Sequence, residues 1–153
     1  MSNVPVAVSI VTFHSERYIR ACLESLLSQD PAPAEIIVVD NASIDGTREI
    51  LLEFRDRVRF VFNHDNRGFC AAHNQAIERT RSPWVLTLNP DVVMAPGFLA
   101  ALVEAGEANA ATGIVCGKLR LLNPDLTSPA EPLLDSTGIY FTPPGRFNTC
   151  AQE

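Results

Sequence analysis

Short runs of Val, Ile and Leu alternate along this chain with segments whose apolar residues recur at helical spacing. The stretch at residues 35–40 is almost continuously apolar, which is typical of a strand buried on both faces. Strands and helices that alternate with short connections favour a parallel sheet covered by helices. The sequence therefore predicts an α/β fold, with strands at residues 4–13, 35–40, 59–63, 83–88 and 113–122.

The segments between these strands carry helical signals. Ser15 and Asp45 each precede a helical stripe and are predicted to be N-caps. His73 falls on the apolar face of its helix, where we expect a packed histidine with one hydrogen-bonded ring nitrogen. The first stripe is Ile19, Cys22, Leu23, Leu26 and Leu27, and the third is Phe69, Ala72, His73, Ala76 and Ile77.

Length and composition indicate one folded domain. The chain has 153 residues, of which 46% are hydrophobic and 20% charged, as in ordinary globular proteins. We predict a single domain over residues 1–153, with its core at 4–122 and an irregular, proline-punctuated extension at 123–153 that holds a short strand at 136–141. Because no last helix closes the sheet, the chain is expected to be truncated at its C-terminus.

Charge and cysteine content narrow the class of protein. The net charge of −6 argues against a nucleic-acid partner, because neutralising phosphates takes clustered Lys and Arg. The chain shows no signal peptide and no apolar run of about twenty residues, so we predict a cytoplasmic location. The four cysteines form no CxxC pair and are expected to be buried thiols in a reducing compartment: Cys22, Cys70, Cys116 and Cys150.

Polar side chains follow three of the predicted strands at the point where each ends. In an open parallel sheet, ligands bind at the carboxyl ends of the strands, near the place where strand order reverses. The sequence therefore predicts a convergent site at this edge. The candidates are Thr12 and His14 after the first strand, Asp40 and Asn41 after the second, and Asn89 and Asp91 after the fourth.

The turn after the first strand contains no glycine, so it lacks the backbone cradle that dinucleotide-binding proteins use for a pyrophosphate. A divalent cation held by a carboxylate is the obvious substitute, and Asp91 is the best-placed ligand. The alternative is that Asn89 and Asp91 simply form a turn. Asp40 also has two possible roles. Its carboxylate either accepts a hydrogen bond from the N–H of a pyrimidine ring or supports the turn that follows it. Glu16 is either part of the site or a partner of the helix dipole.

Five segments taken together resemble the family 2 glycosyltransferases, which have the GT-A fold. The series Glu35-Ile36-Ile37-Val38-Val39-Asp40-Asn41-Ala42-Ser43-Ile44-Asp45-Gly46-Thr47 carries most of this resemblance. The other four segments are residues 8–13, 23–29, 66–74 and 86–91, which occur in the family's order. The resemblance spans residues 4 to 122 and implies a Rossmann-like, mainly parallel sheet flanked by helices.

The resemblance also implies a function. Family members transfer a sugar from a nucleotide-diphosphosugar donor to an acceptor hydroxyl, with inversion and with help from Mn or Mg. It implies that Thr12 and Asp40 contact the base, that Asn41 and Ser43 lie near the ribose, and that Asn66 and Gly68 lie along the donor cleft. It implies that Asp91 binds the metal. His14, Glu16 and Asn89 complete the candidate donor-binding residues.

The chain departs from the family pattern in two places. The family's metal motif usually has two aspartates around one residue, but Asn89 occupies the first position here. The Asn-Pro-Asp version resembles the rhamnosyltransferase-like branch, which implies a dTDP-sugar donor, with a UDP-sugar as the alternative. No motif for the catalytic base appears before Glu153, and nothing around Glu131 or Asp135 matches one, so we assign no base.

Three functions remain open on the sequence alone. The first is a glycosyltransferase acting on a saccharide or lipid-linked acceptor, which would bring the protein to the inner membrane face as a peripheral partner. The second is a nucleotide-sugar-binding module without turnover, because the acceptor and base region is absent. The third is a doubly wound regulatory domain. Such domains gather acidic residues at the carboxyl edge of the sheet, but the first strand here ends in Thr12 and not in an acidic pair, which argues against this function.

Overall fold

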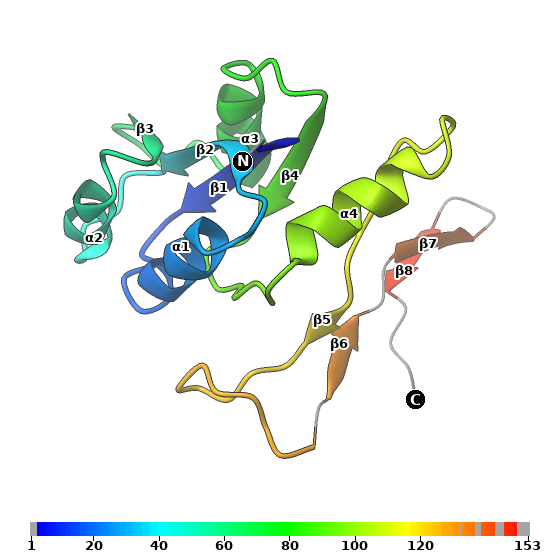
Figure 1. The fold of residues 1–153 in the computed structure, drawn as a ribbon. Helices are drawn as coiled ribbons and strands as arrows, with labels where there is room; N and C mark the ends of the chain where they lie inside the picture. The colour runs from blue at the N-terminus through cyan, green and yellow to red at the C-terminus, as the bar shows by residue number, and fades with distance from the viewer. Residues whose placement is uncertain (1–2, 132, 137–138, 143–145, 150–153) are drawn as a thin grey trace. The chain divides into compact units, whose positions relative to one another are not determined.

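The computed structural model describes residues 3–131, 133–136, 139–142 and 146–149. The chain forms two compact units, Met1–Val103 and Glu104–Glu153. Strands and helices alternate through the first unit (Figure 1). They are β1 (Val4–Thr12), α1 (Ile19–Leu27), β2 (Pro33–Asp40), α2 (Thr47–Glu53), β3 (Arg59–Phe62), α3 (Phe69–Ile77), β4 (Trp84–Leu88) and the start of α4 (Phe98–Glu107).

The first unit is built on a four-stranded parallel sheet in the order β3-β2-β1-β4. The chain adds β2 and β3 on one side of β1 and then crosses back to place β4 on the other side, so strand order reverses at β1. The register aligns Thr12 with Asp40 and Asp40 with Phe62, and it aligns Ile10 with Leu88. The carboxyl ends of all four strands therefore lie along one edge. The predicted α/β class with a parallel sheet is confirmed.

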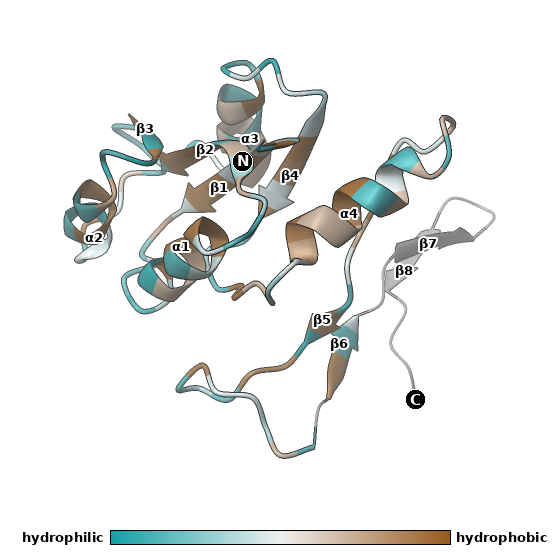
Figure 2. Ribbon diagram, viewed as in Figure 1, coloured by the Kyte–Doolittle hydropathy of each residue, from teal (hydrophilic) through white to brown (hydrophobic). Residues whose placement is uncertain are grey.

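Helices cover both faces of this sheet. On one face, α1 and α2 pack against alternate residues of β1, with Ile10, Leu23 and Leu51 fully buried. On the other face, Ala72 and Ala76 of α3 pack in a smaller cluster with Val11, Ile37 and Val39. β1 is buried along nearly its whole length because it is covered on both sides. In Figure 2, β1 is coloured mainly as hydrophobic, whereas α1 carries both hydrophilic and hydrophobic residues.

The small residues of α3 let this helix approach the sheet closely, which leads to a stability prediction. Ala76 is 1% exposed, so a larger side chain there has no free space. We expect Ala76→Leu to lower the free energy of unfolding by about 1–3 kcal/mol in urea denaturation. Ala71→Leu on the exposed side of the same helix is the matched control and is expected to change little. Equal effects at both positions would contradict this packing.

The second unit contains short antiparallel pairs. β5 (Leu119–Arg120) pairs with β6 (Leu134–Ser136), and β7 (Ile139–Thr142) pairs with β8 (Arg146–Thr149). The short strand predicted at residues 136–141 corresponds to the end of β6 and the start of β7, with residues 137–138 outside the described part of the chain.

The prediction of a strand over residues 113–122 is wrong. Only Leu119–Arg120 form a strand, and its partner is antiparallel. Ile114 is 88% exposed, and most other residues of this run are exposed as well, so the run is not a buried strand. An apolar run becomes a strand only where a neighbouring strand offers its hydrogen-bonding edge.

The expectation of buried thiols holds for one cysteine. Cys22 is buried, and burial, with a smaller effect of the nearby Asp91 charge, raises the pKa of its thiol to about 12. Cys70 and Cys116 are exposed, so the expectation is wrong for them. Cys70 lies on the outer side of α3, and Cys116 lies in the segment that does not form the predicted strand. Cys150 falls outside the described residues.

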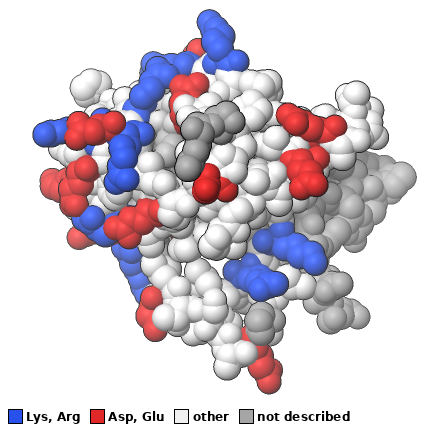
Figure 3. Space-filling model, in the orientation of Figure 1, with Lys and Arg blue, Asp and Glu red and all other residues white. Residues whose placement is uncertain are grey.

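On the face drawn in Figure 3, Lys and Arg side chains are interspersed with Asp and Glu, and large uncharged areas separate them. No helix among the described residues is long and apolar enough to cross a membrane.

Candidate functional site

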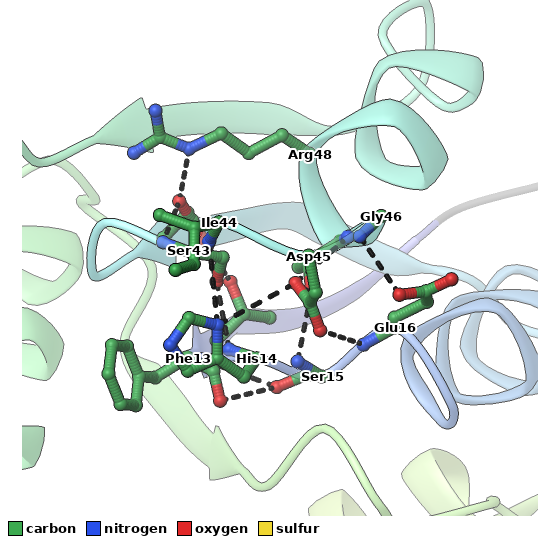
Figure 4. Close-up of polar contacts among 12 residues, drawn as sticks. Phe13, His14, Ser15, Glu16, Ser43, Ile44, Asp45, Gly46 and Arg48 are labelled. Atoms are coloured by element: carbon green, nitrogen blue, oxygen red, sulfur yellow. Dashed lines mark hydrogen bonds and ion pairs between the residues drawn. The ribbon is translucent and has the colours of Figure 1, made fainter.

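The carboxyl edge of the sheet brings together residues from the ends of β1 and β2 and from the loops that follow them (Figure 4). Asp40 lies at its centre and is fully buried. Its Oδ1 accepts hydrogen bonds from Thr12 Oγ1 at 2.9 Å and from Ser43 Oγ at 2.5 Å. Its Oδ2 accepts bonds from the Ser43 backbone N–H at 3.1 Å and from Arg48 Nε at 2.6 Å. The structure thus joins three of the predicted site residues around one carboxylate.

Asn41 sits at the start of a second buried network. Its Oδ1 accepts a bond from Asn63 Nδ2 at 2.9 Å, and its own Nδ2 donates to the carbonyl of Gly68 at 3.2 Å. Asn63, which ends the β3 segment, also bonds with the side chain of Gln75 on α3. Asn41 therefore ties the end of β2 to β3 and to the start of α3. Its side chain is 2% exposed.

Two residues at this edge adopt left-handed backbone conformations despite having a Cβ atom. The φ angle is 53° at His14 and 63° at Ala42. The His14 N–H donates to Ser43 Oγ at 3.0 Å, and its Nδ1 accepts a bond from the Ile44 N–H at 3.4 Å. These contacts lock the two loops to each other. The His14 side chain is 38% exposed and lies against the ring of Phe13, with centroids 4.1 Å apart.

Glu16 and Asp45 form a reciprocal clasp between the same two loops. The Glu16 N–H donates to Asp45 Oδ2 at 3.2 Å, and the Gly46 N–H donates to Glu16 Oε2 at 2.9 Å. Burial alone would raise the pKa of Asp45, but hydrogen bonds from the side chain and N–H of Thr47 and from the Glu16 N–H bring it below its ordinary value. Both carboxylates thus lie at the N-terminus of α2, where negative charge is favourable.

The two predicted N-caps are wrong in different ways. Gly46, not Asp45, occupies the N-cap position of α2, although Asp45 Oδ1 still accepts a bond from the Thr47 N–H at 3.2 Å. Tyr18, not Ser15, is the N-cap of α1. The left-handed turn at His14 directs the Ser15 hydroxyl back to Phe13, so it does not reach the first helical N–H groups.

Asn66 and Gly68 lie in the exposed loop before α3. The Asn66 side chain accepts a bond from the Gly68 N–H at 2.9 Å. Gly68 has a φ of 81°, a conformation that favours glycine, and no atom lies within 4 Å of the place where a Cβ would stand. The loop therefore leaves open space beside Gly68, at the same edge as Asn41.

Asn89 and Asp91 follow β4, which neighbours β1 at the point where strand order reverses. The carbonyl of Asn89 accepts a weak bond from Cys22 Sγ at 3.7 Å, which ties this turn to α1. Both side chains are exposed. No contact within the described part of the chain engages the Asp91 carboxylate in a hydrogen bond or ion pair, in contrast to Asp40 and Asp45.

The described residues contain no group of three His, Cys, Asp or Glu side chains that could hold a metal ion by themselves. Mg²⁺ is usually bound by only one or two carboxylates together with substrate phosphates, so a single free carboxylate is compatible with such an ion. Asp91 is such a carboxylate, and Asn89 lies two residues before it in the chain.

Sequence reasoning missed Arg48, Asn63 and Gln75. The rule that placed Asp40 and Asn41 at the site also applies to Asn63, because Asn63 directly follows β3. Arg48 gives no such signal, since it lies within α2 and only its long side chain reaches the sheet edge. Gln75 lies in the middle of α3 and is likewise visible only in the structure.

His73 is packed as predicted. Its Nδ1 lies 2.7 Å from Ser9 Oγ, and the ring packs edge-on against Phe69. Its buried Nε2 has no hydrogen-bond partner in the described chain. Burial lowers the pKa of His73.

The lowered pKa of His73 gives a pH dependence of stability. As the pH falls below about 6.5, the unfolded chain takes up this proton before the folded chain does, so the free energy of unfolding decreases. We expect His73→Gln to lose less stability than the wild type between pH 7 and pH 5 in urea denaturation. His64→Gln, at an exposed position, is the control and should keep the wild-type pH dependence. An unchanged pH dependence in His73→Gln would contradict this assignment.

The sequence model of the family described as "Glycosyl transferase family 2" matches residues 7–129. The chain belongs to this family. The matched range includes every residue of the carboxyl edge described above, from Thr12 to Asp91. The predicted family is thus confirmed, whereas the rhamnosyltransferase-like branch stays a prediction.

Relatives of this family 2 chain include proteins of polysaccharide synthesis. The succinoglycan biosynthesis protein ExoO of Rhizobium meliloti (strain 1021) is 31% identical over 71% of this chain and 32% of its own length. The poly-beta-1,6-N-acetyl-D-glucosamine synthase of Staphylococcus epidermidis is 28% identical over 77% of this chain and 29% of its own length. The chain spans about a third of the length of the relatives it matches.

Solved structures show the same fold. S. aureus TarS 1-349 superposes with a TM-score of 0.59 at 28% identity, over 67% of this chain and 33% of that chain. The mannosyltransferase PcManGT from Pyrobaculum calidifontis, in complex with GDP-Man and Mn2+, gives 0.62 at 25% identity, over 68% and 32%. These neighbours are GT-A glycosyltransferases, so the predicted GT-A fold class is confirmed.

Proposed function

We propose that this chain holds a nucleotide-diphosphosugar donor at the carboxyl edge of its sheet, for transfer of the sugar to an acceptor hydroxyl with inversion. Membership of family 2 supports the reaction class. The main support for a site at this edge is the Asp91 carboxylate, which is exposed, has no partner among the described residues and lies beside the point where strand order reverses.

The proposed cofactor is Mn²⁺ or Mg²⁺, held by Asp91. When bound, such an ion neutralises the charge that develops on the leaving diphosphate. The complex of PcManGT with GDP-Man and Mn2+ supports a divalent ion in a related site. With Asn89 in place of a second aspartate, the protein contributes one negative charge, so metal affinity is expected to depend on the phosphates of the donor.

The proposed roles of the other residues follow their positions along the edge. Thr12 and Asp40 would contact the base, and Asn41 and Ser43 would lie near the ribose, as the resemblance to the family implies. Asn66 and Gly68 would line the open side of the donor cleft. His14, Glu16 and Asn89 complete the rim. We propose no catalytic base, because none of the described carboxylates outside this edge matches the family's motif.

The proposed donor is a dTDP-sugar or a UDP-sugar. The Asn89-Pro90-Asp91 tripeptide favours the first, and the complex of the related TarS with UDP-GlcNAc favours the second. The proposed acceptor is a saccharide or a lipid-linked saccharide, in keeping with relatives named for polysaccharide synthesis. This reaction would take place in the cytoplasm, with peripheral association at the inner membrane face when the acceptor is lipid-linked.

Release of nucleoside diphosphate from a sugar donor tests this proposal. The chain is incubated with Mn²⁺ and either dTDP-rhamnose or UDP-GlcNAc, with a mixed oligosaccharide acceptor, and the released dTDP or UDP is measured. Release from one donor that disappears with EDTA is the expected result. Binding of a donor without release would instead favour the binding module without turnover. If no donor is bound and no nucleotide is released, the proposed donor site at this edge is contradicted.

A further inference from the structure

The Asp40 carboxylate already accepts as many hydrogen bonds as its two oxygens can take. Thr12 Oγ1 and Ser43 Oγ occupy Oδ1, while the Ser43 N–H and Arg48 Nε occupy Oδ2. An ionised carboxylate offers about four lone-pair positions. A ligand N–H can therefore bond to Asp40 only if one of these donors leaves.

Arg48 is the most exposed of these donors and the one that can move away. Its side chain is 37% exposed, whereas Thr12 is 0% and Ser43 4% exposed. Thr12 is held inside β1, and the Ser43 N–H belongs to the backbone of the turn. The Arg48 guanidinium instead stands at the end of a flexible stem that reaches across from α2 (Figure 4).

The remaining contacts of Arg48 hold its guanidinium over the sheet edge without burying it. Nη2 donates to the carbonyl of Asn63 at 2.9 Å, and the guanidinium carbon lies 5.3 Å from the centroid of the Phe62 ring. Both partners lie at the end of β3. Arg48 thus closes the solvent side of Asp40, on the same edge where the donor is proposed to bind.

We infer that Arg48 is a displaceable cap on Asp40, which a nucleobase with a ring N–H replaces when the donor binds. This inference rests on the proposed function. Uracil, thymine and guanine carry a ring N–H that can take over the vacated position on Oδ2. Cytosine and adenine present a ring lone pair at the equivalent place, which would leave the buried carboxylate facing an acceptor. Arg48 therefore acts as a positioning residue that adds to base selectivity.

The experiment compares UDP with N3-methyl-UDP, which lacks the ring N–H, by calorimetric titration in Mn²⁺. The ratio of the two dissociation constants is measured for the wild type, Arg48→Leu and Arg48→Lys. In Arg48→Leu the N–H bond forms without displacing a competitor, so we expect the preference for UDP to rise about tenfold, the equivalent of one charge-assisted hydrogen bond. Arg48→Lys retains a cationic donor, so its ratio of dissociation constants should stay close to that of the wild type. Arg20→Leu removes an exposed arginine that pairs with Glu53 and should leave the ratio unchanged.

A second readout uses the wild type alone. The Arg48 Nε–H signal in NMR should be protected from exchange in the free protein, lost on addition of UDP and kept on addition of N3-methyl-UDP. An unchanged ratio in Arg48→Leu, or UDP binding with the Nε–H still protected, would overturn the inference and leave the donor site intact. Failure of the wild type to bind UDP, dTDP or GDP would overturn the proposed function, and the inference with it.

Discussion

Asp91→Asn is expected to weaken Mn²⁺-dependent binding of a nucleoside diphosphate about tenfold or more, while any binding without metal stays unchanged. The carboxylate is exposed and free of hydrogen bonds among the described residues, so the substitution removes a charge without disturbing a network. Asparagine keeps the size of the side chain and one oxygen ligand but not the negative charge that a hard divalent cation prefers. Titration with and without Mn²⁺ measures the effect.

Asp56→Asn is the matched control for this experiment. Asp56 is also exposed, but it lies in the connection between α2 and β3, at the opposite edge of the sheet. It should bind like the wild type in both conditions. If Asp91→Asn kept the full Mn²⁺ dependence, Asp91 would not be the metal ligand.

Asp40→Ala is expected to be the most destabilising of the substitutions considered, lowering the free energy of unfolding by about 3 kcal/mol or more. It removes the common acceptor of four donors, leaving the buried hydroxyls of Thr12 and Ser43 without their partner and the Arg48 guanidinium without its counter-charge. Urea denaturation at neutral pH measures the loss.

Glu53→Ala provides the contrast. Glu53 also accepts bonds from an arginine, but the Arg20–Glu53 pair is exposed, and such pairs contribute little. No measurable loss is expected. A loss in Asp40→Ala as small as that in Glu53→Ala would show that Asp40 does not organise the carboxyl edge.

The strands could be predicted from apolar runs where those runs are buried beside a neighbouring strand. Residues 4–12 and 33–40 form β1 and β2 because their Val and Ile side chains are buried on both faces of the sheet. The apolar run at 113–122 carries a similar signal but is largely exposed and has little to pair with. Apolarity reports that burial is favourable, but not that a neighbouring strand is present.

The site could be predicted in its location but not in its internal contacts. Strand-end polar residues gave Thr12, Asp40 and Asn41, because parallel strands end at one edge. The left-handed turns at His14 and Ala42 leave no mark in the sequence, since neither residue is glycine. The Glu16–Asp45 clasp joins the two loops that contain these turns, so the sequence alone did not indicate it.

Arg48 was missed for a related reason. Its position within α2 is ordinary for a helix, and its role comes from the reach of its side chain to Asp40 and Asn63. Side-chain reach across two elements depends on their packing, which periodicity does not encode.

The measurement that tests the central claim most directly is a calorimetric titration of the chain with dTDP, UDP and GDP, each with and without Mn²⁺. A donor site at the carboxyl edge predicts saturable binding of at least one of these nucleotides, weakened when Mn²⁺ is removed. Absence of binding to all three, or binding that is the same with and without Mn²⁺, would contradict a metal-assisted donor site built on Asp91.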